Sequence, residues 1–571
     1  MNLHTKYGKT KLYDQPLYMN PRSTEEVFPV KAIDDSGIFT LNNGKYSKSF
    51  VLSDINFAGV TDMEQKTIII NFSKVLNSVN CRFSYTVANE YVDKNSFSNR
   101  ILYKKRNDDM DDLCDAFNEV INEKVTDAKQ GLYQTIYFTL TVDANNIRDA
   151  KNMFSSIEAT LSSSLVQIGI NGMAGSTLEP ISINQRMQTW FNFTHSGIMT
   201  NYKFDLQECI RHNKNWIDVI SPETISFYND YFVMNGKQYG RVMYISKHAQ
   251  SLESDTIAEL AKINSTNYIT INNELLDLSG YKQEITRKHS SVGLQIEREK
   301  KRNRDNHDFL ADANDKLLSD KDSLIKLSRQ VESGDDHFFN TTIMIMFLAK
   351  SMQELDEITE QIIAVGGVKS FEVKPCFHMQ RQGINSTLMF GAQEFKRMAN
   401  FSAPCLAMYM PFKTQELNDN NGTYYGINKL SQNPIIANRN HGMILGKTRS
   451  GKSVFAKCEI ISNRCLNPED QILIIDPQNE YKGIAHAPGV NGSVVSFDSQ
   501  KEIYVNPMDV NFEGVDYATL QEIIAEKTDF IITLLSSCMR RDIDSGEQGI
   551  LDKVIDQVYS ENYAMRKKLN G

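Results

Sequence analysis

The sequence of 571 residues has no long apolar run. The longest candidate, Thr342 to Ala349, has the length of a strand, whereas a helix that spans a bilayer needs about 20 apolar residues. The first residues, Met1 to Lys6, also lack the apolar stretch of a secretory signal peptide. We therefore expect a cytoplasmic protein whose contact with any membrane is peripheral.

Paired cysteines and a basic excess are absent as well. The eight cysteines are scattered and none forms a C-x-x-C pair, which is typical of reduced structural thiols. The net charge of −9 argues against binding of nucleic acid through overall charge. A local patch remains open: the basic run from Arg298 to Arg304 is either a solvated helix face, the more common case, or a contact for phosphate or acidic lipid.

What the sequence does contain is a complete phosphate-binding loop, G-x-x-x-x-G-K-[ST], at residues 446–453. Its two glycines permit backbone angles that let consecutive N–H groups turn toward phosphate oxygens. Lys452 reaches the β- and γ-phosphates, and the hydroxyl of Ser453 joins the ligand shell of Mg²⁺. Lys452 and Ser453 are the expected catalytic residues, and Ser453 is the expected metal ligand. The residues expected to bind ATP are Gly446, Lys447, Thr448, Arg449, Ser450, Gly451, Lys452 and Ser453.

The segments around the loop have the order of a β-α-β unit. Residues 442–445 form an apolar strand candidate, and residues 454–461 suit a helix that ends before Asn467-Pro468. Residues 471–476 are a near-continuous apolar strand, the kind that is buried in a parallel sheet. The alternative, a chance glycine-rich turn before a core helix, does not account for this context.

The chain as a whole predicts a mixed α/β and α+β fold. We expect an α+β domain over residues 1–280, then a helical stretch with a β-α-β unit over residues 281–403 that completes the N-terminal region. The P-loop ATPase domain is expected over residues 404–571. Asn43-Gly44 and Asn235-Gly236 mark two hairpin turns. The repeated β-α-β units suggest ferredoxin-like pieces.

The end of the chain is expected to change from strands to helices. Residues 493–497 and 502–505 are two further strand candidates, and a helical pattern begins at Tyr517. Residues 545–548 fit a capping box before the last helix.

Hydrolysis of ATP needs an acid that holds Mg²⁺ and a residue that positions water. Asp476, at the end of the second apolar strand, is a candidate for that acid, with Glu480 as a further candidate. The structural alternative is that Asp476 caps a turn at Pro477. The spacing alone does not separate these readings.

Three motifs together resemble the large conjugative ATPases of type IV secretion systems, the VirB type. They are the loop at 446–453, the run Ile474 to Tyr481, which holds Asp-Pro-Gln-Asn-Glu-Tyr, and Val505-Asn506-Pro507-Met508-Asp509. Upstream, residues 30–39, 53–57, 425–428 and 431–433 resemble the Gram-positive branch of that family. The resemblance covers the chain from about residue 28 to its end.

The resemblance implies membership of the FtsK–HerA group of RecA-like motors. In that family the Asp-Pro-x-x-Glu-Tyr motif follows the phosphate loop, and the acids for hydrolysis come later, beyond a helical insert. By resemblance the insert begins near residue 514 and the RecA-like sheet is incomplete. The chain would then end before the hydrolytic acid, as in a truncated product or a fragment. The resemblance therefore argues against Asp476 as the acid that holds Mg²⁺.

The first hypothesis is therefore an ATP-binding motor or energising subunit of a conjugative DNA-transfer machine at the inner face of the cell membrane. The resemblance implies membrane subunits of the secretion apparatus as partners, a homo-oligomer that is a hexamer in that family, and indirect or weak contact with DNA. The second hypothesis is a non-hydrolytic platform that docks on the apparatus. A DNA translocase or helicase of the same superfamily is the third.

Overall fold

The computed structural model divides the chain into two compact units, Met1–Ile474 and Ile475–Gly571, which are considered separately. The structure describes residues 21, 23–91, 102–127, 132–170, 175–196, 202–249, 251–305, 314–334, 336–413, 417, 419, 422–428, 434–438, 441–487, 489–496, 506–510 and 517–569.

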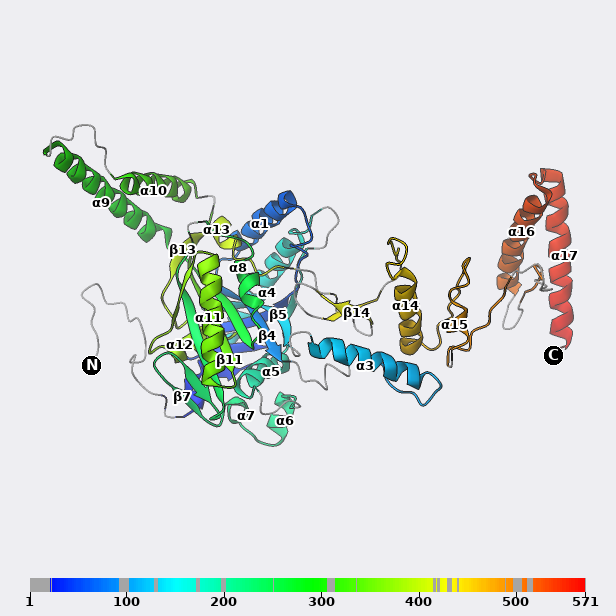
Figure 1. The fold of residues 1–571 in the computed structure, drawn as a ribbon, viewed down its shortest axis with the longest axis horizontal. Helices are drawn as coiled ribbons and strands as arrows, with labels where there is room; N and C mark the ends of the chain where they lie inside the picture. Colours follow the sequence, from blue (N-terminus) through cyan, green and yellow to red (C-terminus); the bar gives the residue numbers. More distant parts are fainter. Residues whose placement is uncertain are drawn as a thin grey trace. The chain divides into compact units, whose positions relative to one another are not determined.

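In the first unit, the described strands up to residue 402 form a 13-stranded sheet whose neighbouring strands are antiparallel (Figure 1). One half follows the β-α-β-β-α-β order of a ferredoxin-like fold. Its strands lie in the order β6-β3-β5-β4. The hairpin β1–β2 precedes β3, and Gly44 has φ 79° in the predicted Asn43-Gly44 turn. The elements are β1 (Val30–Ile33), β2 (Ile38–Leu41), β3 (Tyr46–Leu52), α1 (Asp62–Asn77), β4 (Arg82–Tyr91), α3 (Asp111–Asp127), β5 (Leu132–Val142), α4 (Ile147–Val166) and β6 (Leu178–Pro180).

The other half of the sheet repeats this plan. Its strands lie in the order β12-β9-β11-β10, and the hairpin β7–β8 precedes β9. The predicted turn at Asn235-Gly236 joins β8 to β9, with φ of 51° and 66° at these residues. The elements are β7 (Ile225–Phe227), β8 (Phe232–Met234), β9 (Gln238–Lys247), α8 (Thr256–Ala261), β10 (Asn267–Leu275), α9 (Leu278–Asp305), α10 (Asp315–Ser333), β11 (Phe338–Ala349), α11 (Met352–Val368) and β12 (Glu372–Pro375).

The two halves meet where β4 pairs with β10, which are equivalent strands of the two repeats. The ferredoxin-like prediction is thus confirmed, and the structure adds that the unit occurs twice. Each repeat also carries helices in the same connection. α3 lies between β4 and β5, and the α9–α10 hairpin lies between β10 and β11. Strands on both sides of residue 280 belong to this one sheet.

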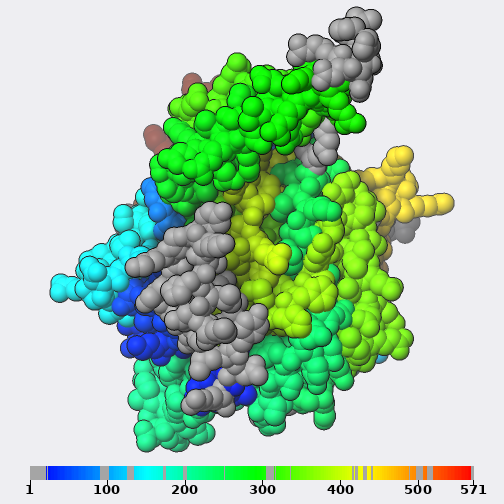
Figure 2. Space-filling model, turned by 90° about the vertical axis from the view of Figure 1, so that its left-hand side faces the viewer, coloured from blue at the N-terminus to red at the C-terminus, as the bar shows by residue number. Residues whose placement is uncertain are grey.

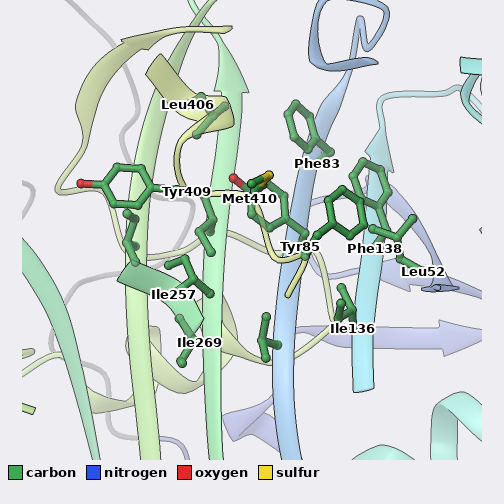
Figure 3. Packing of buried hydrophobic residues seen from close by; sticks show 14 of the residues in the cluster. Leu52, Phe83, Tyr85, Ile136, Phe138, Ile257, Ile269, Leu406, Tyr409 and Met410 are labelled. Atoms are coloured by element: carbon green, nitrogen blue, oxygen red, sulfur yellow. The ribbon is translucent and has the colours of Figure 1, made fainter. Parts of the chain in front are cut away.

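Alternation along the strands builds a core on each face of the sheet. On one face, Phe83 and Tyr85 of β4 pack with Ile136 and Phe138 of β5 (Figure 3). Buried side chains of α1, α4, α8 and α11 belong to the same cluster. Tyr409 and Met410, which follow α13 (Ala403–Ala407), belong to the same cluster. The opposite core contains side chains of α5 (Ile183–Thr194), α6 (Leu206–Arg211), α7 (Trp216–Ile220) and α12 (Gln380–Thr387). β13 (Ala399–Ser402) pairs with β11.

A short hairpin and one helix follow in the first unit. β14 (Thr423–Ile427) pairs antiparallel with β15 (Pro434–Ala437), which confirms the predicted hairpin. The expected helix after the phosphate loop is α14 (Lys452–Leu466).

The second unit contains α15 (Lys482–Ala485), α16 (Tyr517–Met539) and α17 (Ser545–Leu569). Leu520, Ile524 and Ile531 of α16 are buried with Ile555 and Tyr559 of α17, which confirms the predicted helical pattern. The predicted cap of α17 is wrong by one residue. Asp544, not Ser545, accepts the backbone N–H of Glu547 at 2.9 Å, and Glu547 accepts the backbone N–H of Asp544 at 3.2 Å. A carboxylate followed by an acid three residues later forms the same reciprocal cap.

The predicted parallel sheet is not formed among the described residues. Residues 442–445, 471–476 and 493–496 belong to no strand, and the strand candidate at 502–505 lies outside the part of the chain that the structure describes. Leu445, Leu473 and Ile475 are 82%, 91% and 87% exposed. The apolar pattern is that of a buried strand, but a strand exists only through hydrogen bonds to a neighbour, and pairing is what these segments lack here.

Candidate nucleotide-binding site

The backbone conformation of the phosphate-binding loop explains why it contains two glycines. Arg449 and Gly451 have φ of 64° and 89°, in the left-handed region, and the backbone N–H of Ser450 donates to the carbonyl of Lys447 at 3.2 Å. A Cβ on Gly446 would lie 2.3 Å from the Ser450 hydroxyl oxygen, so only glycine fits there without a shift of that side chain. A Cβ on Gly451 would meet no atom within 4 Å, and its positive φ is the reason for glycine.

Lys452, the first residue of α14, folds back over the loop. Its Nζ donates to the carbonyl oxygens of Gly446 and Lys447 at 2.8 and 3.0 Å. The ammonium group is therefore held at the loop, close to the first turn of α14, which also contains Ser453. The first N–H groups of a helix have no partner within the helix, and together with the helix dipole they attract an anion. The chemistry fits a triphosphate with Mg²⁺.

The other candidate residues of the loop are open to solvent. Lys447, Thr448, Arg449 and Ser450 are all exposed. The eight predicted residues thus lie together in the turn and the first two residues of the 15-residue helix α14. Residues 446–451 are exposed, and Lys452 and Ser453 are half-buried.

An aromatic contact on the first half of α14 was not predicted from the sequence. Tyr425 of β14 stacks on Phe455 with ring centroids 5.9 Å apart, and its hydroxyl donates to the Glu459 carboxylate at 2.7 Å. The hairpin before the loop therefore fixes the helix that follows it. The family resemblance is the only sequence signal that marks residues 425–428.

Asp476 belongs to the second unit and caps a turn. One carboxylate oxygen accepts the backbone N–H of Gln478 at 3.2 Å, and the other accepts that of Tyr481 at 2.9 Å. This is the geometry of the capping alternative. Glu480 lies exposed in the same turn. Whether either residue binds Mg²⁺ stays a prediction.

Neither a membrane-spanning helix nor a cluster of metal-binding side chains is found among the described residues. In that part of the chain, no helix has the length and apolar character to cross a bilayer. No group of three or more His, Cys, Asp or Glu side chains that would hold a metal was found in the same residues. A Mg²⁺ ion on a phosphate loop does not need such a group, because phosphate oxygens and water supply most of its ligands.

Comparison with known families identifies one match. Residues 436–566 match the family described as "Helicase HerA, central domain". The match begins in β15, contains the whole phosphate loop and the Asp476 turn, and ends in α17. It supports the FtsK–HerA superfamily of P-loop ATPases for this region. No curated protein matches the chain.

Proposed function

We propose that the chain is an ATP-binding motor or energising subunit of a conjugative type IV secretion machine. The observation that carries the proposal is the loop at 446–453, with Lys452 held over it by two hydrogen bonds at the start of α14. The match of residues 436–566 to the HerA central domain supports a P-loop ATPase. The conjugative role rests on the motif resemblance.

Nucleotide binding uses groups that the loop already presents. Lys452 would hold the β- and γ-phosphates in place of its two carbonyl partners, and the hydroxyl of Ser453 would be a ligand of Mg²⁺. A bound Mg²⁺ would neutralise part of the negative charge of the phosphates. We further propose that residues 442–445, 471–475 and 493–496 pair as parallel strands when the domain is assembled, since their apolar side chains are exposed otherwise.

A non-hydrolytic platform is the second candidate, and the geometry of Asp476 favours it. Both of its carboxylate oxygens accept backbone N–H groups, so a metal would compete with the cap. Turnover would then need acids or an arginine from a neighbouring subunit of an oligomer, which the resemblance suggests is a hexamer. Measuring phosphate release by purified protein, with Lys452→Ala as the blank, separates a motor from a platform.

We expect Asp476→Asn to change Mg-ATP affinity less than about threefold. An amide oxygen still accepts one backbone N–H, so the turn at 476–481 persists, and metal binding is unaffected if the residue only caps. Isothermal titration measures the affinity, and circular dichroism checks the fold. A loss of affinity above about tenfold in a folded variant would assign the metal to Asp476.

A DNA translocase of the same superfamily is the third candidate. The HerA match is compatible with it, whereas the net charge of −9 disfavours extensive contact with DNA. Stimulation of phosphate release by double-stranded DNA, steeply reduced by salt, would favour this candidate over a secretion motor.

A peripheral membrane position is part of the proposal, and the outer side of α9 is the surface that suits it. Arg287, Leu294, Arg298 and Lys301 follow one another at spacings of seven, four and three residues, which places them on one stripe of the helix. All four are exposed, and Leu294 is 55% exposed in the middle of the stripe. The α9–α10 hairpin projects from the sheet in Figure 1, and its residues are green in Figure 2.

We expect the protein to float with vesicles that contain about 30% anionic lipid and not with neutral vesicles. Each basic side chain near an anionic surface contributes about 1 kcal/mol, so changing Arg287, Arg298 and Lys301 together to glutamine should abolish flotation at moderate salt. The control removes the same number of charges from α10, by changing Lys321, Lys326 and Arg329. Equal loss in both variants would show that total charge, not the α9 stripe, is responsible.

A further inference from the structure

The insertion between β4 and β5 contacts the helix of the phosphate loop. The guanidinium of Arg106, in the segment before α3, donates from Nη2 to the carbonyl oxygen of Leu466 at 2.8 Å. Leu466 is the last residue of α14, and the carbonyl groups at the end of a helix have no partner within it. Arg106 therefore caps α14 with a positive charge at the negative end of the helix dipole.

A buried cluster lies behind this cap. Cys114 of α3 and Cys465 of α14 are each 3% exposed and lie against one another. Burial is the main cause that raises the pKa of the Cys465 thiol, and the neighbouring Cys114 thiol is the second. Tyr103 is buried beside Ser462 and Cys465, and burial raises its pKa to about 12. Its hydroxyl lies near the Ser462 hydroxyl without forming a hydrogen bond of ordinary geometry. The insertion is thus packed on α14, not merely adjacent to it.

The burial of α14 is concentrated at this end. Ser462 and Cys465 are its buried residues, whereas Val454, the residue after the loop, is 64% exposed. The insertion holds the C-terminal end of the helix, and the N-terminal end presents the loop. A helix is a rigid rod over this length, so a change in direction at one end is transmitted to contacts at the other.

The insertion is also tied to the main sheet. It connects β4 to β5, which are neighbours over ten residues of register, from Arg82↔Thr141 to Tyr91↔Leu132. β5 is an inner strand of the first repeat, and β4 lies at the junction of the two repeats, where it pairs with β10. The insertion therefore bridges the ferredoxin-like sheet and the nucleotide loop within one unit.

We propose that this insertion couples the sheet to the nucleotide site. Arg106 is a positioning residue for Mg-ATP, and the packing at the Cys114–Cys465 contact changes when nucleotide binds. The inference rests on the proposed binding of Mg-ATP at residues 446–453. Because coupling is reciprocal, nucleotide should tighten the contact between α3 and α14, and loss of the contact should weaken nucleotide binding.

The test follows alkylation of each cysteine of the whole protein by N-ethylmaleimide, read peptide by peptide by mass spectrometry, with and without Mg-ATP. We expect Mg-ATP to slow labelling of Cys114 and Cys465 at least about fivefold, the lower end of ordinary coupling. Cys209 and Cys376 lie in the core on the α5 face of the sheet and serve as internal controls with unchanged rates.

Arg106→Ala should remove this nucleotide effect and weaken Mg-ATP binding about fivefold, and Arg106→Lys should restore part of both. The matched control is Lys105→Ala, because Lys105 is exposed in the same segment and pairs with Asp115 at 2.6 Å. It should leave both measurements unchanged.

Two results overturn the coupling while leaving the proposed function intact. One is wild-type protein that binds Mg-ATP with unchanged labelling of Cys114 and Cys465. The other is Arg106→Ala protein that is less stable yet binds Mg-ATP with wild-type affinity. Wild-type protein that binds no Mg-ATP overturns both proposals.

Discussion

Replacing Lys452 by alanine should lower the affinity for Mg-ATP by at least about 100-fold. The ammonium already donates to two carbonyl oxygens at the loop, and with nucleotide present it would donate to phosphate oxygens instead. Hydrogen bonds to charged groups contribute about 1.5–3 kcal/mol each, so the loss of two corresponds to two decades of affinity or more. Titration followed by calorimetry measures the change directly.

The control for Lys452 is an exposed lysine outside the loop. Lys482→Ala removes the same charge from α15 and should leave the affinity within about twofold of wild type. If Lys452→Ala also bound Mg-ATP with wild-type affinity, the loop would not be the nucleotide site.

Arg186→Leu should lower the free energy of unfolding of the first unit by about 3 kcal/mol. Arg186 of α5 is 2% exposed and donates to the carbonyls of Gly37 and Ser47, the Ser47 hydroxyl and the carbonyl of Met389, at 2.7–2.9 Å. Its guanidinium also lies 3.7 Å from the centre of the Phe39 ring. Leucine leaves these acceptors buried without a donor, and each such loss costs about 1 kcal/mol or more.

The two tryptophans of the chain allow this loss of stability to be measured in the region of Arg186. Trp190, on the same helix as Arg186, lies 6.0 Å from Trp216 between ring centroids, so tryptophan fluorescence during urea unfolding reports this region. Arg148→Leu, at an exposed position of α4, is the matched control and should change stability by less than about 0.5 kcal/mol. An Arg186→Leu protein as stable as this control would refute the role assigned to the buried guanidinium.

Local signals explain why much of the fold was predictable. The turns at Asn43-Gly44 and Asn235-Gly236 require positive φ, and Asn-Gly supplies it at the same place in both repeats. The long strand β11 is a near-continuous apolar run of strand length, buried on both faces. The helix α4 buries Ala150, Phe154, Leu161 and Leu165 at helical spacing, so both elements follow from local sequence.

Features that depend on distant contacts could not be predicted. The duplication is defined by which strands pair, and the pairing of strands far apart in the chain does not follow from the matching Asn-Gly turns. Likewise, Arg106 and Leu466 are 360 residues apart, and nothing local marks either one as a partner. The strand candidates beside the phosphate loop show the reverse case: their pattern is strong, but pairing decides whether a strand forms.

The candidate site likewise contains one feature that was predictable from local sequence and one that was not. The loop at 446–453 was predictable because its function depends on backbone geometry that two glycines, a lysine and a serine specify locally. The role of Asp476 was left open by the sequence because a carboxylate after a strand serves a metal or a turn equally well. The structure shows the turn, with two backbone N–H groups on its oxygens.

Calorimetric titration of the wild-type protein with ATP, in the presence and absence of Mg²⁺, tests the central claim most directly. We predict saturable binding of one Mg-ATP per chain, weakened when Mg²⁺ is removed, because Ser453 then has no metal to share with the phosphates. Absence of binding at millimolar Mg-ATP by protein whose fold is confirmed by circular dichroism would contradict it.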